Sequence, residues 1–370
     1  IMGLMGAFFW AIRGTSGFGG SAGGTLAGLG WALLWLGFSH LRRDGALRPY
    51  GSDRMVAAIA LGIAFGGMTG YGVYISWLNG VYQMKGNEVT CAIAPWTGYA
   101  MLFVCGIHWG GVTGSFMAWV APQRPMTWPL WGCRIAAGIV GAGLATLLVK
   151  CCPGLFLPYY SEGYYQVADY ATSARAMRSI LTIAQHVGLF AGFLGFELAR
   201  RDGRAVKIML TMALGFALPF AIGGYWQTMH GSELRLDWWK NWEMTIGLGG
   251  GLAFGLAFSF FNRPEPAKPR PVLRMERVLC VGLVVWLMLG TVLPGAYEGF
   301  INVRGLTVSL ASTRTLLSWV CRGVAAVVFI LWVCRGVTTS KRRQTDPHRP
   351  LLPLPVIAGL LTVIVCAGYV

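Results

Sequence analysis

The chain has 370 residues, of which 55% are hydrophobic and only 12% are charged. Because soluble proteins carry about 25% charged residues, this composition excludes an ordinary soluble protein and predicts a chain that mostly faces lipid. The formal charge is +16, from 30 Lys and Arg against 14 Asp and Glu. Since the basic residues fall in short runs between apolar segments, they indicate membrane topology and no nucleic-acid partner.

Apolar segments of spanning length predict an all-α polytopic membrane protein with about ten transmembrane helices. Connections rich in Lys and Arg alternate with connections that are poor in them, and the positive-inside rule then places both termini outside the cytoplasm. We expect the protein in the lipid bilayer of a bacterial inner membrane. The predicted spans are residues 7–38, 55–78, 96–119, 132–149, 180–199, 206–229, 242–261, 278–297, 316–333 and 351–369.

An internal duplication is the most specific pattern in the chain. Arg42-Arg43-Asp44-Gly45 recurs as Arg200-Arg201-Asp202-Gly203, and the stretch from Gly110-Gly111 to Arg124-Pro125 recurs from Gly249-Gly250 to Arg263-Pro264. Ordered recurrence of this kind predicts repeated structural units. We expect one four-helix membrane repeat over residues 1–165, a second over 175–300, and two additional C-terminal helices over 310–370. An even number of spans makes the two repeats parallel, and such repeats form a cavity where they meet.

The 53 glycines are densest between Gly14 and Gly24, where Thr15 and Ser16 add hydroxyl groups. One interpretation is close helix packing, which small residues allow in a bilayer. The other is a broken helix whose free N–H groups bind an anion. The length of the first apolar segment favours a break, and both interpretations stay open. For the run Gly249 to Gly251, which has no neighbouring hydroxyls, we expect helix packing.

Ionisable side chains inside a bilayer are costly, so each is a candidate for function. Glu197 lies one turn before Arg200 and Arg201, and an ion pair explains it. Glu243 follows Lys240 and is either a similar pair or a functional group. Arg322 is either functional or an anchor at the interface. Arg13, beside the glycine and serine run, is the strongest candidate in the set.

Two histidines lie inside predicted spans. His108 falls near the middle of the third span, and it is either a hydrogen-bonded interior residue or a functional one. His186 lies in the fifth span. We expect the two at different depths, separated by about 9 Å along a helix axis, which argues against a shared haem.

The leading hypothesis is a secondary transporter or channel for a small polar, anionic solute bound at the repeat interface. The candidate binding residues are Arg13, Thr15, Ser16, Glu243 and Arg322, and the candidate proton-coupling residues are His108, His186 and Glu298. One alternative is a membrane-embedded transferase acting on a lipid-linked or periplasmic substrate, with a histidine as base. Another is a non-catalytic subunit bound to other membrane subunits. No motif indicates a metal or a cofactor, and without a Walker motif ATP-driven transport is not expected.

Overall fold

The computed structural model describes residues 1–13, 20–41, 48–83, 90–162, 171–265 and 282–295, together with single positions between 316 and 330. The described chain is almost entirely helical, with one short antiparallel pair of strands. The main elements are α1 (Met2–Arg13), α2 (Gly20–Leu41), α3 (Asp53–Gly66), α4 (Ile75–Leu78), β1 (Val81–Gln83), β2 (Thr90–Ala92), α5 (Pro95–Val120), α6 (Trp128–Cys151), α7 (Ala171–Ala199), α8 (Gly203–Gly223) and α9 (Trp238–Phe261).

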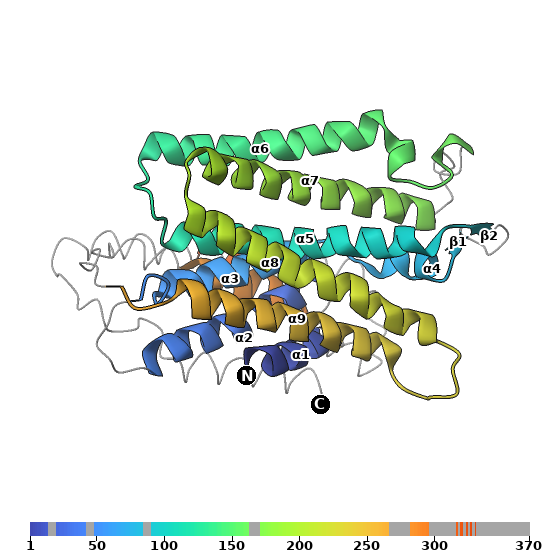
Figure 1. Cartoon of the computed structure of the whole chain (residues 1–370), viewed down its shortest axis with the longest axis horizontal. Coiled ribbons are helices and arrows are strands. Elements are labelled where there is room, and N and C mark those ends of the chain that lie inside the picture. Colours follow the sequence, from blue (N-terminus) through green and yellow to red (C-terminus); the bar gives the residue numbers. More distant parts are fainter. Residues whose placement is uncertain are drawn as a thin grey trace.

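The long helices run side by side along one axis (Figure 1). α6 and α7 form one side of the bundle, α5 and α8 lie next to them, and α9, α1 and α2 lie on the opposite side. The connections at 121–127 and 200–202 and the segment 262–265 gather at one end. The strands β1 and β2 and the connection between α8 and α9 lie at the other.

Six helices among the described residues are long and apolar enough to cross a membrane. They indicate an all-α integral membrane protein, as the composition predicts. Their ranges are Gly20–His40, Pro95–Val120, Trp128–Cys151, Met177–Ala199, Gly203–Met229 and Trp238–Phe261, and three shorter apolar helices are Met2–Arg13, Arg54–Gly66 and Gly282–Gly295.

The prediction of one span over residues 7–38 is wrong, because this segment is two helices folded against each other. The ring of Phe9 on α1 packs on Gly30 of α2, and Trp10 packs on Trp31. In one continuous helix, residues about twenty apart would be about 30 Å apart. The second part of the glycine run, Gly20 to Gly24, is helical in α2, whereas residues 14–19 lie outside the described part.

The second predicted span, 55–78, is also not one helix. α3 ends at Gly66, and a turn, a short 3-10 helix and α4 follow. Gly66 and Gly67 end the helix, because glycine has low helix propensity and Gly67 packs directly on the backbone of Gly20. Of the last two predicted spans, 351–369 lies outside the described residues, and 316–333 is described only at single positions.

Stripes of large apolar side chains on the outer helices face away from the bundle. On α8 they recur every four residues at Leu210, Leu214, Leu218 and Ile222, and on α9 a similar stripe runs through Leu248, Leu252, Leu256 and Phe260, all at least 39% exposed. Residues four apart lie on one face of a helix. Exposed apolar stripes of this length are typical of surfaces that contact lipid.

Glycines set the contacts between the central helices. Gly106, Gly110 and Gly114 recur every four residues on α5 and lie directly on the backbone of α8, where a Cβ at Gly110 would collide with the Met212 carbonyl oxygen. Gly250 packs on the Phe216 ring and Gly251 on the Met2 carbonyl, so the predicted packing role of that run is confirmed. Such contacts let helix backbones approach closely in lipid.

We predict that Gly110→Ala destabilises the protein, because the added methyl group meets the Met212 backbone and cannot be relieved by a rotamer change. The expected cost is about 1–3 kcal/mol, the range for overpacked interiors. It is measured as a lower unfolding temperature of the purified protein in detergent. Gly132→Ala, on the exposed face of α6 with nothing within 4 Å, is the matched control. Its stability should be unchanged or slightly raised, and equal losses in both variants would contradict the prediction.

Candidate functional site

Arg13 ends α1 and is buried, with 5% of its surface exposed. Its guanidinium lies over three aromatic rings, 4.5 Å from the Trp10 centroid, 5.0 Å from Trp109 and 5.5 Å from Tyr71. One terminal nitrogen donates a hydrogen bond to the Tyr71 hydroxyl at 2.7 Å. Nε is buried with no partner, and among the described residues no carboxylate lies within ion-pair distance of Arg13.

Tyr71 connects Arg13 to the second half of the chain. Its ring packs at right angles to Phe220 and stacks parallel to Trp239 at 6.0 Å. Burial raises the pKa of the Tyr71 hydroxyl, and the neighbouring Arg13 charge opposes this shift. The phenol therefore stays neutral at physiological pH. Because it accepts a hydrogen bond from Arg13, its own proton remains available to donate.

Glu243 is buried in the first turns of α9 and forms an ion pair with Lys240, with Oε2 and Nζ 2.7 Å apart. This is the end pair that the sequence offered as one interpretation of Glu243. Lys240 also donates a hydrogen bond to the carbonyl oxygen of Ala11, two residues before Arg13. Glu243 raises the pKa of Tyr71 through its charge, so it lies in the same electrostatic environment as Arg13. Arg13, Lys240 and Glu243 together carry a net charge of +1.

We call Arg13, Tyr71, Trp109, Lys240 and Glu243 the arginine site. Arg13, Tyr71 and Trp109 come from the predicted first repeat, whereas Lys240 and Glu243 come from the second. The site thus lies between the two segments that the duplication defines, toward the end of the bundle where α9 begins (Figure 1). Of the other predicted binding and coupling residues, Thr15, Ser16, Arg322 and Glu298 lie outside the described residues.

His108 and His186 are in direct contact, so the prediction that they lie at different depths is wrong. Their Nδ1 atoms are 2.8 Å apart, the ring planes are within 4° of parallel, and both residues are buried. The prediction counted depth along ideal helices from estimated span ends and took no account of how α5 and α7 pass each other. With the rings this close, no haem fits between them.

The hydrogen bonds assign a tautomer to each histidine when both are neutral. Nε2 of His108 lies 3.0 Å from the carbonyl oxygen of Gly66, which only accepts, so this nitrogen carries the proton. Nδ1 of His108 must then accept, and Nδ1 of His186 donates to it. Nε2 of His186 is left as an unprotonated acceptor. The two hydrogen bonds therefore run in one direction, from His186 to His108 and from His108 to the Gly66 carbonyl oxygen.

The histidine pair and the arginine site are joined through Gly66. Its carbonyl oxygen accepts from His108, and its Cα packs on the Trp109 ring, whose centroid lies 5.0 Å from the Arg13 guanidinium. The contacts thus run from His108 through Gly66 to the Trp109 ring and from there to Arg13.

A buried cluster of charged side chains lies at the other end of the bundle. The sequence predicts only one of its ion pairs. The predicted pair of Glu197 with Arg200 is present at 3.2 Å, but Glu197 also pairs with Arg134 of α6 at 2.5 Å, and both of these side chains are fully buried. The Arg134 guanidinium lies 4.5 Å from the Trp131 ring centroid. Arg134 stands at the edge of an apolar run, and the sequence pattern does not distinguish it from the basic residues that indicate membrane topology.

The second copy of the Arg-Arg-Asp-Gly motif, residues 200–203, forms a clamp at this end, whereas the first copy lies outside the described residues. Asp202 accepts hydrogen bonds from the backbone N–H groups of Gln123 and Arg124, and also caps α8 by accepting from Ala205. Arg200 donates to the carbonyl oxygens of Arg124 and Pro125. The motif thus fixes the connection between α5 and α6, which is a structural role.

Comparisons with models of known protein families, with curated proteins and with solved structures find no match to this chain. Within the described residues there is also no group of three His, Cys, Asp or Glu side chains that could hold a metal ion. The function must therefore be argued from the arginine site and the histidine pair.

We predict that Glu197→Gln strongly destabilises the protein, because it leaves Arg134 buried without a counter-charge. Breaking a buried ion pair from one side costs about 3–5 kcal/mol, and thermal unfolding in detergent measures the loss. The double variant Arg134→Met/Glu197→Leu should recover part of the stability. Glu265→Gln, at the partly exposed pair with Arg204, is the control and should cost about 1 kcal/mol or less. Equal effects at the two glutamates would contradict the prediction.

Proposed function

We propose that this protein is a secondary transporter or channel for a small polar, anionic solute that binds at the arginine site. The observation that carries the proposal is the buried guanidinium of Arg13, which the described residues surround with aromatic faces and one phenol but with no carboxylate. An unpaired charge in a low-dielectric interior is expensive. An anion that enters the site would supply the missing counter-charge.

The structural alternative is that the protein by itself stabilises Arg13. Cation–π contacts contribute about 0.5–2 kcal/mol each, and a cation in the last turn of α1 interacts favourably with the helix dipole. These terms offset part of the cost of desolvating the guanidinium. They leave the net charge of +1 uncompensated, because Lys240 already pairs with Glu243.

The site offers donors suited to an oxyanion. The Nε–H group of Arg13 has no partner among the described residues, and the Tyr71 hydroxyl keeps its proton for donation. A guanidinium binds carboxylate, sulfate or phosphate oxygens through two parallel hydrogen bonds. The rings of Trp10 and Trp109 restrict the space beside Arg13, so the geometry favours a small solute over a bulky one.

His108 and His186 are the proposed proton-coupling groups. The unprotonated Nε2 of His186 can accept a proton, and this pair connects to the arginine site through Gly66 and Trp109. Protonation of the pair would add positive charge near a bound anion. Such coupling would make uptake of an anion depend on the proton gradient.

The proposed framework is a pair of parallel repeats in the membrane. Contacts between the segments support it, because each packs on the other: the carbonyl oxygen of Asn262 accepts from Arg48, and Thr25 on α2 lies 3.0 Å from Thr291. The end that carries the clamp holds the basic residues Arg48, Arg124, Arg200, Arg201, Arg204 and Arg263. By the positive-inside rule we assign this end to the cytoplasmic side of a bacterial inner membrane.

We predict that Arg13→Gln abolishes anion transport while the protein still folds. Removing the guanidinium removes both the charge and the paired donors, so we expect uptake to fall more than tenfold. Arg13→Lys keeps the charge but not the planar fork and should retain partial activity. Uptake of nitrate, acetate, sulfate and phosphate into proteoliposomes measures the effect.

Arg235→Gln is the matched control, because Arg235 is exposed in the connection between α8 and α9. It should transport like the unmodified protein. Uptake that is unchanged in Arg13→Gln would remove Arg13 from the site. If the unmodified protein takes up none of the four anions, the transferase and subunit hypotheses replace this proposal.

We predict that His186→Gln removes the pH dependence of uptake. A glutamine at this position cannot take up a proton, so any rise in uptake with falling pH should be lost, while uptake at pH 8 is retained. The same proteoliposome assay at several external pH values tests this. His230→Gln, at an exposed position outside the pair, is the control. An unchanged pH profile in His186→Gln would contradict proton coupling through the pair.

A further inference from the structure

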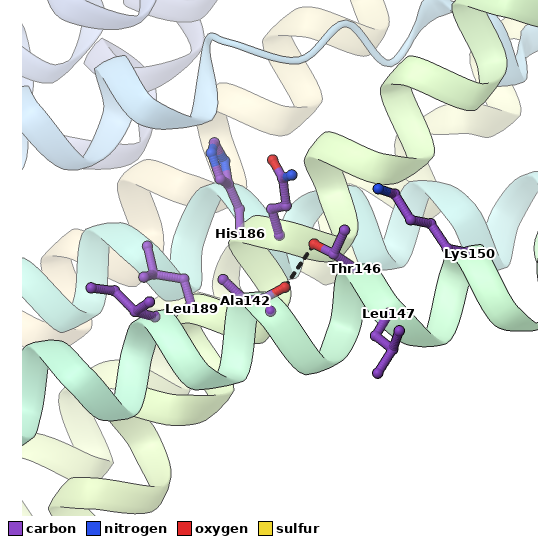
Figure 2. A pocket seen from close by; sticks show the side chains of 9 residues that line it. Ala142, Thr146, Leu147, Lys150, His186 and Leu189 are labelled. Carbon is purple, nitrogen blue, oxygen red and sulfur yellow. Dashed lines mark hydrogen bonds between the residues drawn. The ribbon is translucent and has the colours of Figure 1, made fainter.

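A groove of about 560 Å³ lies between α6 and α7, on the outer side of the bundle. Figure 2 shows its lining side chains. Along α6 they recur at alternating intervals of three and one residues, which places them on a single helix face about 16 Å long. The residues are Ile139, Ala142, Gly143, Thr146, Leu147 and Lys150 of α6, and Gln185, His186 and Leu189 of α7.

The groove faces the surroundings of the bundle rather than its interior. Ile139 is 63% exposed and Leu147 is 56% exposed, and α6 has the lowest buried fraction of the six candidate spans. Gly143 has no atom within 4 Å of the position that a Cβ would take, so it opens the floor of the groove. In a bilayer, an apolar groove on this surface is reached from the lipid and not from water.

The polarity of the groove changes along its length. Lys150 lies in the last turn of α6 and is exposed, and no carboxylate pairs with it among the described residues. The side chain of Gln185 is also exposed, and its amide can donate a hydrogen bond. The Thr146 hydroxyl is not available, because it donates to the Ala142 carbonyl oxygen at 2.7 Å (Figure 2). Toward Ile139 and Leu189 the lining is apolar.

We propose that this groove binds one anionic phospholipid. The lipid phosphate lies at Lys150, where α6 ends at the membrane boundary, and an acyl chain lies along Gly143 and Ile139. Gln185 donates to an ester carbonyl oxygen between these two parts. The positive charge of Lys150 near the membrane surface favours an anionic headgroup over a zwitterionic one.

This site shares no residue with the arginine site, so lipid binding here can be tested separately from anion binding at Arg13. Its only contact with the proposed coupling groups is His186, whose side chain forms part of the groove wall. A bound lipid would therefore cover the outer side of the histidine pair and limit the access of water from that side.

The test is native mass spectrometry of the purified full chain with phosphatidylglycerol or phosphatidylcholine of matched acyl chains. The unmodified protein should bind phosphatidylglycerol more tightly. Lys150→Gln should lower the affinity for phosphatidylglycerol about fivefold, to the level of phosphatidylcholine. Gly143→Phe should fill the groove and abolish the binding of both phosphatidylglycerol and phosphatidylcholine at this site.

Gly132→Phe is the matched control, since Gly132 lies on the same helix with open space above it and outside the groove. It should bind lipid like the unmodified protein. Equal lipid binding by Gly143→Phe and Gly132→Phe would overturn the proposal, and so would an undiminished preference for phosphatidylglycerol in Lys150→Gln. If Gly143→Phe does not fold, the Lys150→Gln variant, at an exposed position, still tests the preference for phosphatidylglycerol. A dimer that Gly143→Phe dissociates would show that a second copy occupies the groove, and this too would overturn the proposal.

Discussion

The direct contact of helix backbones at glycine positions is the constraint on which the rest of this structure depends. In lipid, burying apolar side chains between helices gives little driving force, because acyl chains are as apolar as leucine. Association then depends on close packing. Gly110 on α5 against Met212 of α8, and Gly6 on α1 against Gly247 of α9, bring backbones within van der Waals contact. A larger side chain at either place would separate two helices.

These contacts position the residues of the arginine site. Trp109 precedes Gly110 on α5, so the packing of α5 on α8 fixes the ring against which Arg13 lies. The packing of α1 on α9 brings the end of α1 to Lys240, whose ammonium group bonds to the Ala11 carbonyl. The charged groups of the arginine site therefore meet because glycines elsewhere on the same helices let the backbones approach.

The buried cations of the described region differ in whether a carboxylate pairs with them. At the arginine-rich end, Arg134 and Glu197 neutralise each other and Arg200 ties the cluster to a connecting loop. At the arginine site, Glu243 is neutralised by Lys240, and Arg13 has aromatic neighbours and one phenol instead of a carboxylate. In the first arrangement the two fully buried side chains neutralise each other without a ligand, which is why we assign it to stability. The second lacks a negative charge, which is why we assign it to binding.

The sequence by itself determined the membrane class, the helical fold and two charged candidates at the arginine site, Arg13 and Glu243, but it did not indicate Tyr71 or Trp109. Composition and charge pattern are properties of the whole chain, and an ionisable residue inside an apolar run is visible without coordinates. Local pairs such as Lys240 with Glu243 also follow from helical spacing.

Only the tertiary structure decided which distant residues meet. The fold of α1 against α2, the contact of His108 with His186 and the pairing of Arg134 with Glu197 each join different helices. Their relative depth and rotation depend on where glycines allow two backbones to touch. Sequence periodicity describes the faces of one helix at a time, and it contains no information on how far one helix is shifted along its neighbour.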